Sequence, residues 1–223
     1  METIRPDEAN YPKLLKELED APSPLYFTGS LPKANDVLVA IVGTRKAGRE
    51  GLLAAKQIGH GLAKAGAVVV SGLALGIDGA AHEGAVAAHG RTIAVLGTGA
   101  DFIYPAAHEN LARVILENGG AILSEYSPGT PSLPYQFLER NRIISGLSVA
   151  TVVIEAPARS GALATARFAL EQGRELFVVP GPAVSQNYRG SHMLLRNGAR
   201  VVTSAEEILE DLEIIMENLQ MAL

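Results

Sequence analysis

The stretch "VLVAIVGTRKAG" (residues 37–48) joins an unbroken apolar run to a polar turn, and a helix-like segment (48–65) follows it. The run lacks a polar residue at every second position, which is typical of a strand covered on both faces of a parallel sheet. Gly43, Thr44 and Arg45 stand where this strand would end. A buried strand, a short turn and a helix together predict the α/β class.

The same unit recurs along the chain. Short connections between alternating strands and helices favour a Rossmann-like, doubly wound, mostly parallel sheet of six to seven or more strands, with helices on both faces. We take residues 37–203 as this domain. The further strands are expected at 67–72, 92–97, 121–125, 150–156, 175–181 and, more weakly, 199–203, and the further helices at 78–89, 107–118, 135–146, 161–173 and 189–197.

The two ends of the chain differ from this pattern. Residues 1–36 contain one short amphipathic helix and an extended segment with several prolines, and we expect this N-terminal extension to pack on the edge of the sheet. Residues 204–223 are expected to form a C-terminal acidic helix that docks on the domain.

Composition excludes several classes of protein. The 223 residues are 48% apolar, enough for a sizeable core, and contain no cysteine, which excludes disulfides, thiol catalysis and cysteine-ligated metals. No apolar stretch approaches the roughly 20 residues of a membrane helix, and no secretory leader is evident. We therefore expect a cytoplasmic protein with no membrane partner.

The net charge of −5 argues, on average, against a nucleic-acid binder. The distribution is uneven, however. Residues 130–200 carry eight basic residues against four acidic ones, whereas residues 201–223 carry six acidic residues and no basic one. All eight basic residues of the first block are arginine, which suits bidentate contacts to phosphate, although a scattered surface charge would give the same count.

Polar loops follow four of the predicted strands, at 43–48, 71–82, 97–105 and 157–166. Ligands of an open α/β sheet bind outside the carboxyl ends of its strands, so these loops are the candidate site. A glycine-rich turn is also needed for packing alone, but four such loops on one edge favour a site for an anion. The candidate residues are Gly43, Thr44, Arg45, Ser71, Gly72, Ser160, Gly161 and Thr165.

Known nucleotide motifs are missing. The turn after the first strand is not G-x-G-x-x-G, the second strand does not end in an acidic residue, and no G-x-x-x-x-G-K-[ST] occurs. The histidines lack zinc-enzyme spacing, so we assign no metal and no cofactor. Asp78 and His82 could form a catalytic pair, but a local contact within one helix is the favoured interpretation.

The segment "FLERNRIISGLS" (137–148) places Arg140, Asn141 and Arg142 inside otherwise apolar sequence. It indicates either a structural ion pair or a site for an anion. Arg140 and Arg142 would lie about 200° apart around a helix. We therefore expect one to face the loop-lined cleft, preferably Arg140, and the other to tie the helix to the sheet. Glu155, at the end of a strand, is the expected counter-ion of one of them.

Taken together and in this order, "GTR", "SGLALGIDGAAH", "GTGADFIYP", "SEYSPGTP", "FLERNRIISGLS", "EAPARSGALATA" and "GSHMLLRNGA" resemble the Rossmann-type core of the DprA/Smf (DNA-processing protein A) family, from about residue 10 to about residue 212. The resemblance implies a protein that binds and protects single-stranded DNA, loads the RecA recombinase onto it during natural transformation, and forms homodimers. Many members carry further helical and winged-helix domains, for which this chain has no full room.

The resemblance also implies roles for individual residues. The family's motifs fall on Gly43, Thr44 and Arg45, on Phe137, Arg140, Asn141 and Arg142, and on Ser160, Gly161, Leu163 and Thr165. They are expected to hold the DNA backbone. Phe137 and Tyr104 are candidates for stacking on bases, although core packing explains Phe137 equally well.

An enzyme is the alternative. The loops resemble, more distantly, those of the lysine-decarboxylase-like (LOG) phosphoribohydrolases, which act on nucleoside monophosphates. Their P-G-G-x-G-T-x-x-E signature is absent, and the corresponding "RSGALATARFA" has no glutamate in the catalytic place. We assign no catalytic residue and favour DNA binding.

Overall fold

A computed structural model describes residues 1–221 of the chain, with side-chain surroundings as far as residue 213. Within this range the strands form one nine-stranded sheet in the order β1-β2-β6-β5-β4-β3-β7-β8-β9. The strands are β1 (Glu2–Ile4), β2 (Leu25–Gly29), β3 (Leu38–Val42), β4 (Val68–Ser71), β5 (Thr92–Leu96), β6 (Ala121–Ser124), β7 (Ala150–Val153), β8 (Glu175–Val178) and β9 (Arg200–Val201).

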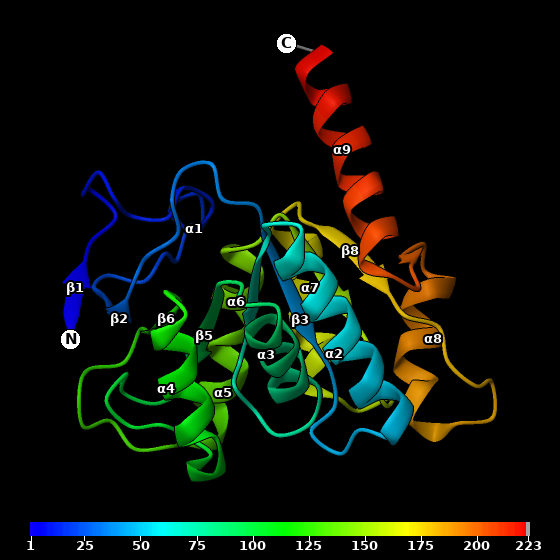
Figure 1. Ribbon diagram of the computed structural model, residues 1–223, viewed down its shortest axis with the longest axis horizontal. Helices are drawn as coiled ribbons and strands as arrows, with labels where there is room; N and C mark the ends of the chain where they lie inside the picture. The colour runs from blue at the N-terminus through cyan, green and yellow to red at the C-terminus, as the bar shows by residue number, and fades with distance from the viewer. Residues whose placement is uncertain (222–223) are drawn as a thin grey trace.

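The seven strands from β3 to β9 are parallel, so the predicted Rossmann-like sheet is confirmed. The chain proceeds from β3 through β4 and β5 to β6, and then returns to place β7 on the other side of β3. In Figure 1 the connection from β3 to α2 (Arg49–Lys64) lies at the bottom, on the side opposite to the C-terminal helix. The carboxyl ends of the parallel strands therefore face that lower edge.

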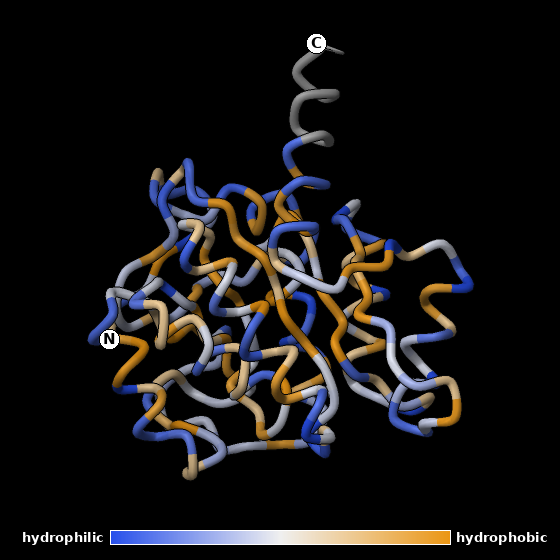
Figure 2. Tube along the Cα trace, turned by 45° about the vertical axis from the view of Figure 1, so that its right-hand side comes forward, coloured by the Kyte–Doolittle hydropathy of each residue, from blue (hydrophilic) through white to orange (hydrophobic). Residues whose placement is uncertain are grey.

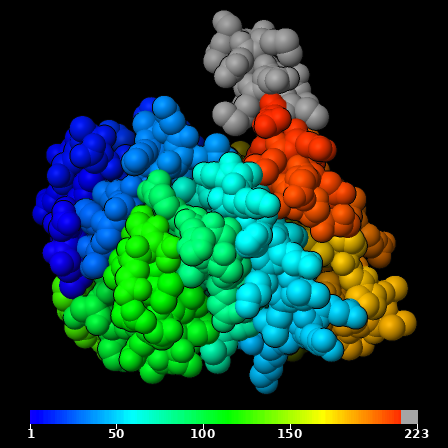
Figure 3. All heavy atoms as spheres, in the orientation of Figure 1, coloured from blue at the N-terminus to red at the C-terminus, as the bar shows by residue number. Residues whose placement is uncertain are grey.

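The N-terminal extension contributes two strands, which the sequence interpretation described only as an extended segment. β2 pairs antiparallel with β6, and β1 pairs antiparallel with β2. An arginine of the core, Arg174, also holds the extension: its Nη2 donates to the Leu14 carbonyl at 2.9 Å and pairs with Glu17 at 3.0 Å. Figure 3 shows this N-terminal part (blue) packed against the body of the molecule.

Helices cover both faces of the sheet because the buried strands are apolar on both sides. In β3, Val39 and Ile41 face one core, and Leu38 and Ala40 face the other. Figure 2 shows long apolar segments (orange) running through the middle of the fold, while many of the segments on its outline are hydrophilic (blue). Packed on the first face are α2, α3 (Ile77–Ala87), α4 (Glu109–Glu117) and α9 (Ala205–Met221), and on the second α1 (Lys13–Lys16), α6 (Asn141–Gly146) and α7 (Gly161–Glu171). The remaining helices are α5 (Pro134–Glu139), α8 (Arg189–Arg196) and the short η1 (Ala106–His108) and η2 (Gln186–Tyr188).

The single helix predicted over 135–146 is wrong, because two helices, α5 and α6, meet at Arg140. The Ile143 amide donates to the Arg140 carbonyl at 2.9 Å, a tighter turn than that of an α-helix. The side chain of Arg140 is buried at the ends of β4 and β5, and this anchors the junction between the two helices.

The predicted C-terminal helix corresponds to α9, which packs its first turns against α2 and buries Ile208 and Leu212. Residues 222–223 of that prediction lie outside the described residues. None of the helices within residues 1–221 combines the length and the apolar character that crossing a membrane requires.

Candidate nucleic-acid interface

A cavity of about 400 Å³ opens at the carboxyl edge of the sheet, between the parallel neighbours β3 and β7, where the order of the strands reverses. Ligands of doubly wound sheets bind at such a switch point, because the loops on its two sides diverge and leave a crevice. The loops after β3, β4 and β7 form three of its walls, and α5 and α6 form the fourth. Of the predicted site residues, Gly43, Thr44, Arg45, Phe137, Arg140, Asn141, Ser160, Gly161 and Thr165 line it.

Glu155 holds the loop after β3 in place. Its carboxylate accepts the Gly48 amide at 3.0 and 3.1 Å, and its main-chain carbonyl accepts the Thr44 amide at 2.7 Å. Asn187 Nδ2 donates to the same carboxylate at 2.5 Å and to the Lys46 carbonyl at 3.3 Å. The side chain is 1% exposed. A Cβ on Gly51 would lie 2.0 Å from Glu155 Oε2, so the carboxylate occupies space that only a glycine leaves free.

The predicted ion pair of Glu155 with Arg140 or Arg142 is therefore wrong. Glu155 lies at the N-terminus of α2, where unpaired amides and the helix dipole stabilise a negative charge without any cation. The amides of Thr44, Lys46 and Gly48 are all engaged within the protein. These three amides are therefore not available to a ligand anion, whereas the side chains of Arg45 and Lys46 are exposed.

Arg45 and Lys46 are both exposed cations of this loop, and Arg45 is the one that lies over an aromatic ring. Its guanidinium lies 5.0 Å from the centre of the Phe137 ring, in cation–π geometry. Tyr104 packs against Phe137, with ring centres 5.4 Å apart and planes tilted by 46°. Tyr104 is 41% exposed, so one ring of this stack is open to solvent. A second cavity, of about 50 Å³, lies beside the stack and is lined by Arg45, Leu75, Tyr104 and Phe137 among others.

Arg140 lies deeper and is 2% exposed. Its Nη1 donates to the Gly72 carbonyl at 2.8 Å and to the Val95 carbonyl, while Nε is buried without a partner. Burial lowers the pKa of Arg140 to about 10, so the side chain is still charged at neutral pH. Asp78 lines the same cavity, and burial raises the pKa of its carboxyl although Arg140 partly offsets this. The cavity thus has a buried positive charge with an acidic neighbour at its base.

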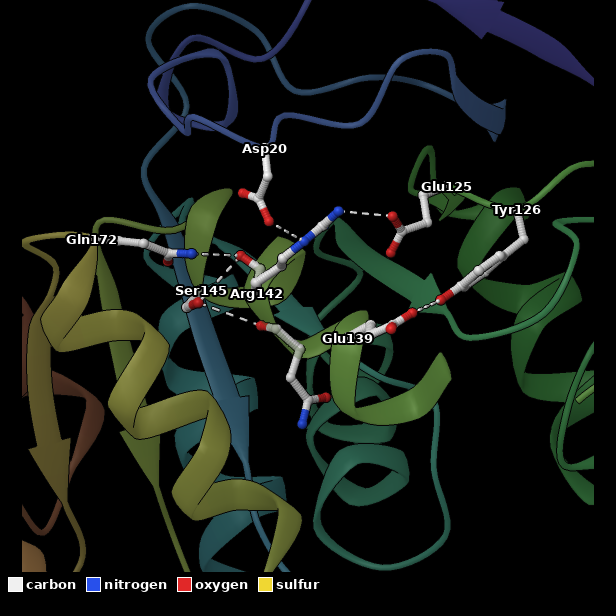
Figure 4. A network of polar contacts seen from close by, with 8 residues as sticks. Asp20, Glu125, Tyr126, Glu139, Arg142, Ser145 and Gln172 are labelled. Atoms are coloured by element: carbon white, nitrogen blue, oxygen red, sulfur yellow. Dashed lines mark hydrogen bonds and ion pairs between the residues drawn. The ribbon is translucent and has the colours of Figure 1, made fainter. Parts of the chain in front are cut away.

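Arg142 lies outside the cavity. It pairs with Glu125 at 2.8 Å and with Asp20 at 2.6 Å, and so ties α6 to the end of β6 and to the N-terminal extension, as Figure 4 shows. Burial raises the pKa of the Glu125 carboxyl, an effect that Arg142 partly offsets. The expected division between the two arginines is found, because one lines the cleft and the other has a structural partner.

The N-terminus of α7 supplies the polar wall opposite Arg45. Ser160 Oγ accepts the Ala162 amide at 3.2 Å, which leaves the hydroxyl proton free to donate. Asn141 Nδ2 donates to the Gly161 carbonyl at 3.2 Å, and Thr165 Oγ1 makes a long contact of 3.5 Å to the same oxygen. These contacts fix the start of α7 beside α6, at the wall of the cavity.

Besides Arg142, and Tyr104 of the second cavity, two further predicted site residues do not line this cavity. Ser71 is fully buried, and its hydroxyl donates to the Ile41 carbonyl at 2.6 Å. Gly72 lines only the small second cavity, and a side chain there would collide with Arg140. His82 likewise bonds Thr92 Oγ1 at 2.7 Å rather than Asp78, and burial lowers the pKa of the imidazole to about 3. The favoured contact between Asp78 and His82 is therefore not formed.

The sequence interpretation missed four residues at or beside the cavity. Lys46 and Arg159 line it from the quoted "GTRKAG" and "PARSG" loops, and their charge was an available signal. Asp78 was considered only as a partner of His82. Asn187 had no signal, because its role depends on the packing of the loop after β8 against the loop after β3.

Comparison with known proteins gives one consistent family. A family model described as DNA recombination-mediator protein A matches residues 2–213. Protein Smf of Escherichia coli (strain K12) is 45% identical over 210 residues, 94% of this chain and 56% of that protein. DNA processing protein DprA of Streptococcus pneumoniae is 42% identical over 203 residues, 91% of this chain and 71% of that protein. The chain thus spans only part of the length of these relatives.

Solved structures agree with the sequence matches. DprA from Streptococcus pneumoniae superposes with a TM-score of 0.87 at 40% identity, covering 94% of this chain and 73% of that chain. DprA from Helicobacter pylori, whose structure was described for its single-stranded DNA binding mode, gives 0.82 at 32% identity over 95% and 94% of the two chains. The molybdenum cofactor carrier protein from Chlamydomonas reinhardtii, at 0.56 and 16% identity, shares the fold alone.

Proposed function

Because this chain belongs to the DNA recombination-mediator protein A (DprA/Smf) family, we propose that it binds single-stranded DNA at the switch-point cavity and acts in DNA processing by binding rather than by catalysis. The observation that carries the proposal is the pairing of cations with an exposed aromatic stack in one cleft. Arg45 covers Phe137, Tyr104 extends the stack to solvent, and Arg140 lies beneath. Cations that follow a backbone beside rings that accept bases are the recurring design of single-strand sites.

A mononucleotide enzyme is less well supported by the same geometry. A phosphate held by the first βα turn needs free amides at the N-terminus of the following helix. Here Glu155 already occupies the start of α2 through Gly48. Side chains on a broad edge remain for the anion, which suits a flexible polyanion better than a single compact phosphate.

We assign the roles as follows. Arg45 and the start of α7, at Ser160 and Gly161, contact backbone phosphates, and Tyr104 and Phe137 stack on bases. Arg140 supplies the positive potential of the cavity, while Thr44, Asn141 and Thr165 fix the loops that carry these groups. Arg142 has a structural role, because its Nε and Nη2 already pair with Asp20 and Glu125.

The test is a titration with a fluorescent oligothymidylate. Arg45→Ala is expected to weaken binding about tenfold, because it removes a phosphate contact and the cation over Phe137. The slope of log affinity against log salt, between about 50 and 200 mM, should fall by roughly 0.7 for each lost contact. Arg113→Ala is the control, since Arg113 is an exposed arginine on α4 that pairs with Glu117. Salt-independent binding, or equal losses in the two variants, would contradict the proposal.

Two partners extend this proposal. Homodimers are supported by β9, which ends the sheet, leaves an unpaired strand edge and carries Val201, 59% exposed. Val201→Glu should yield monomers in analytical ultracentrifugation, and a monomeric wild type would refute this surface as a dimer interface.

The recombination-mediator description of the family supports transfer of the bound DNA strand to RecA. The test is whether RecA assembles faster on single-stranded DNA that is coated with this protein.

A further inference from the structure

Three exposed cations stand in a row along the carboxyl edge, starting at the cavity. Lys46 follows β3, Arg159 follows β7, and Arg189 follows β8. These strands are neighbours in the order β3-β7-β8, and adjacent strands lie about 4.8 Å apart. Within the described residues none of the three side chains forms an ion pair. Only the first two line the cavity, so the row continues beyond it.

Hydrogen bonds fix the position of Arg189 relative to the cavity. The amides of Gly190 and Ser191 donate to the Ala156 carbonyl at 2.8 and 3.2 Å, and Ser191 Oγ accepts the Ala156 amide at 3.1 Å. A Cβ on Gly190 would lie 2.6 Å from the Pro157 carbonyl. The first turn of α8 is therefore seated directly on the loop that carries Arg159.

The electrostatics of this edge favour a negatively charged partner. Arg189 is the first residue of α8, and Arg49 is the first residue of α2. A cation at the positive end of a helix is unfavourable, and acidic residues are the usual occupants of that position. The first turns of α7 and α8, which the structure describes in full, contain no acidic residue. The first turn of α2 contains one, Glu50. The buried Nε of Arg140 has no hydrogen-bond partner in the described residues and adds an unsatisfied donor beside the adjoining cavity.

We propose that single-stranded DNA leaves the cavity across the ends of β7 and β8, with its phosphates held in turn by Arg159 and Arg189. This path rests on the proposed function and adds a second segment to it. The aromatic rings of the site, exposed Tyr104 and half-buried Phe137, lie on the other side of β3. Tyr188, beside Arg189, is buried. The second segment therefore holds the backbone alone, and base identity has no influence there.

The experiment compares two thymidylate lengths, about 4 and about 16 nucleotides, which span known single-strand site sizes. Arg189→Ala is expected to weaken binding of the longer oligonucleotide about fivefold. It should also reduce the slope of log affinity against log salt by roughly 0.7, the value for one phosphate contact. It should leave the shorter one unchanged, because the shorter one fills the cavity first.

Arg196→Ala is the matched control, since Arg196 is an exposed arginine at the opposite end of α8 without an ion pair in the described residues. Equal binding by the two variants would overturn the path, and so would an equal loss of both oligonucleotides in Arg189→Ala. If the wild type bound neither length, the proposed function itself would fail. If the wild type bound both oligonucleotides, and Arg45→Ala weakened this binding but Arg189→Ala did not, the proposed function would be supported and only the proposed path across β7 and β8 would be refuted.

Discussion

Replacing Arg140 with alanine is expected to lower the free energy of unfolding by about 3–5 kcal/mol, the usual cost of removing one partner from a buried charged cluster. The variant would leave the carbonyls of Gly72 and Val95 without their donor and Asp78 without its cation. Urea denaturation measures the change. Arg142→Ala should cost less, about 1–2 kcal/mol, because Asp20, one of its two partners, is 64% exposed.

A second substitution separates the charge from the packing. Asp78→Asn in the Arg140→Ala background should recover part of the lost stability, because it removes the uncompensated buried carboxylate. DNA titration of the same proteins completes the comparison. We expect Arg142→Ala to bind DNA as the wild type does once both are folded. Equal losses of DNA binding in the two arginine variants, with no loss of stability in either, would refute the division of roles between Arg140 and Arg142.

The parallel core of the sheet was predictable from the sequence because its signal is local. Each of β3 to β7 is a short apolar run followed by a turn, and every residue of these strands is buried. The strands β1 and β2 were not predicted. The position of β2 depends on antiparallel pairing with β6, and β1 in turn pairs with β2. The paired residues Phe27 and Leu123 are almost a hundred positions apart in the sequence. Hydrophobic periodicity carries no information about such a partner.

The site was predictable as a set of loops but not as a set of contacts. The sequence predicted different roles for Arg140 and Arg142, one lining the cleft and one tying the helix to the sheet, because a helix directs residues two positions apart to different faces. The partners were assigned wrongly, because both Glu125 and Glu155 end a strand and sequence does not say which one a given arginine meets. Position in three dimensions decides it. Glu155 lies under the N-terminus of α2, and Glu125 lies beside α6.

Replacing Glu155 with glutamine is expected to lower the free energy of unfolding by about 2 kcal/mol, the upper range for the loss of a helix cap. The glutamine has nearly the same shape but lacks the charge that faces α2. The side-chain NH₂ group of the glutamine is a donor in place of a carboxylate oxygen. It would face another donor, either the Gly48 amide or Asn187 Nδ2. Glu83→Gln is the matched control, because that exposed glutamate pairs only with Lys56 and should change stability by less than about 0.5 kcal/mol.

DNA binding distinguishes a positioning role for Glu155 from a purely structural one. Because Glu155 acts through the loop that carries Arg45, Glu155→Gln should weaken oligothymidylate binding several-fold under conditions where the variant is fully folded. The same change should have little effect once Arg45 is already alanine, since residues that act through one another do not give additive losses. Additive losses in this double-mutant cycle would mean that Glu155 stabilises the fold without setting the position of Arg45.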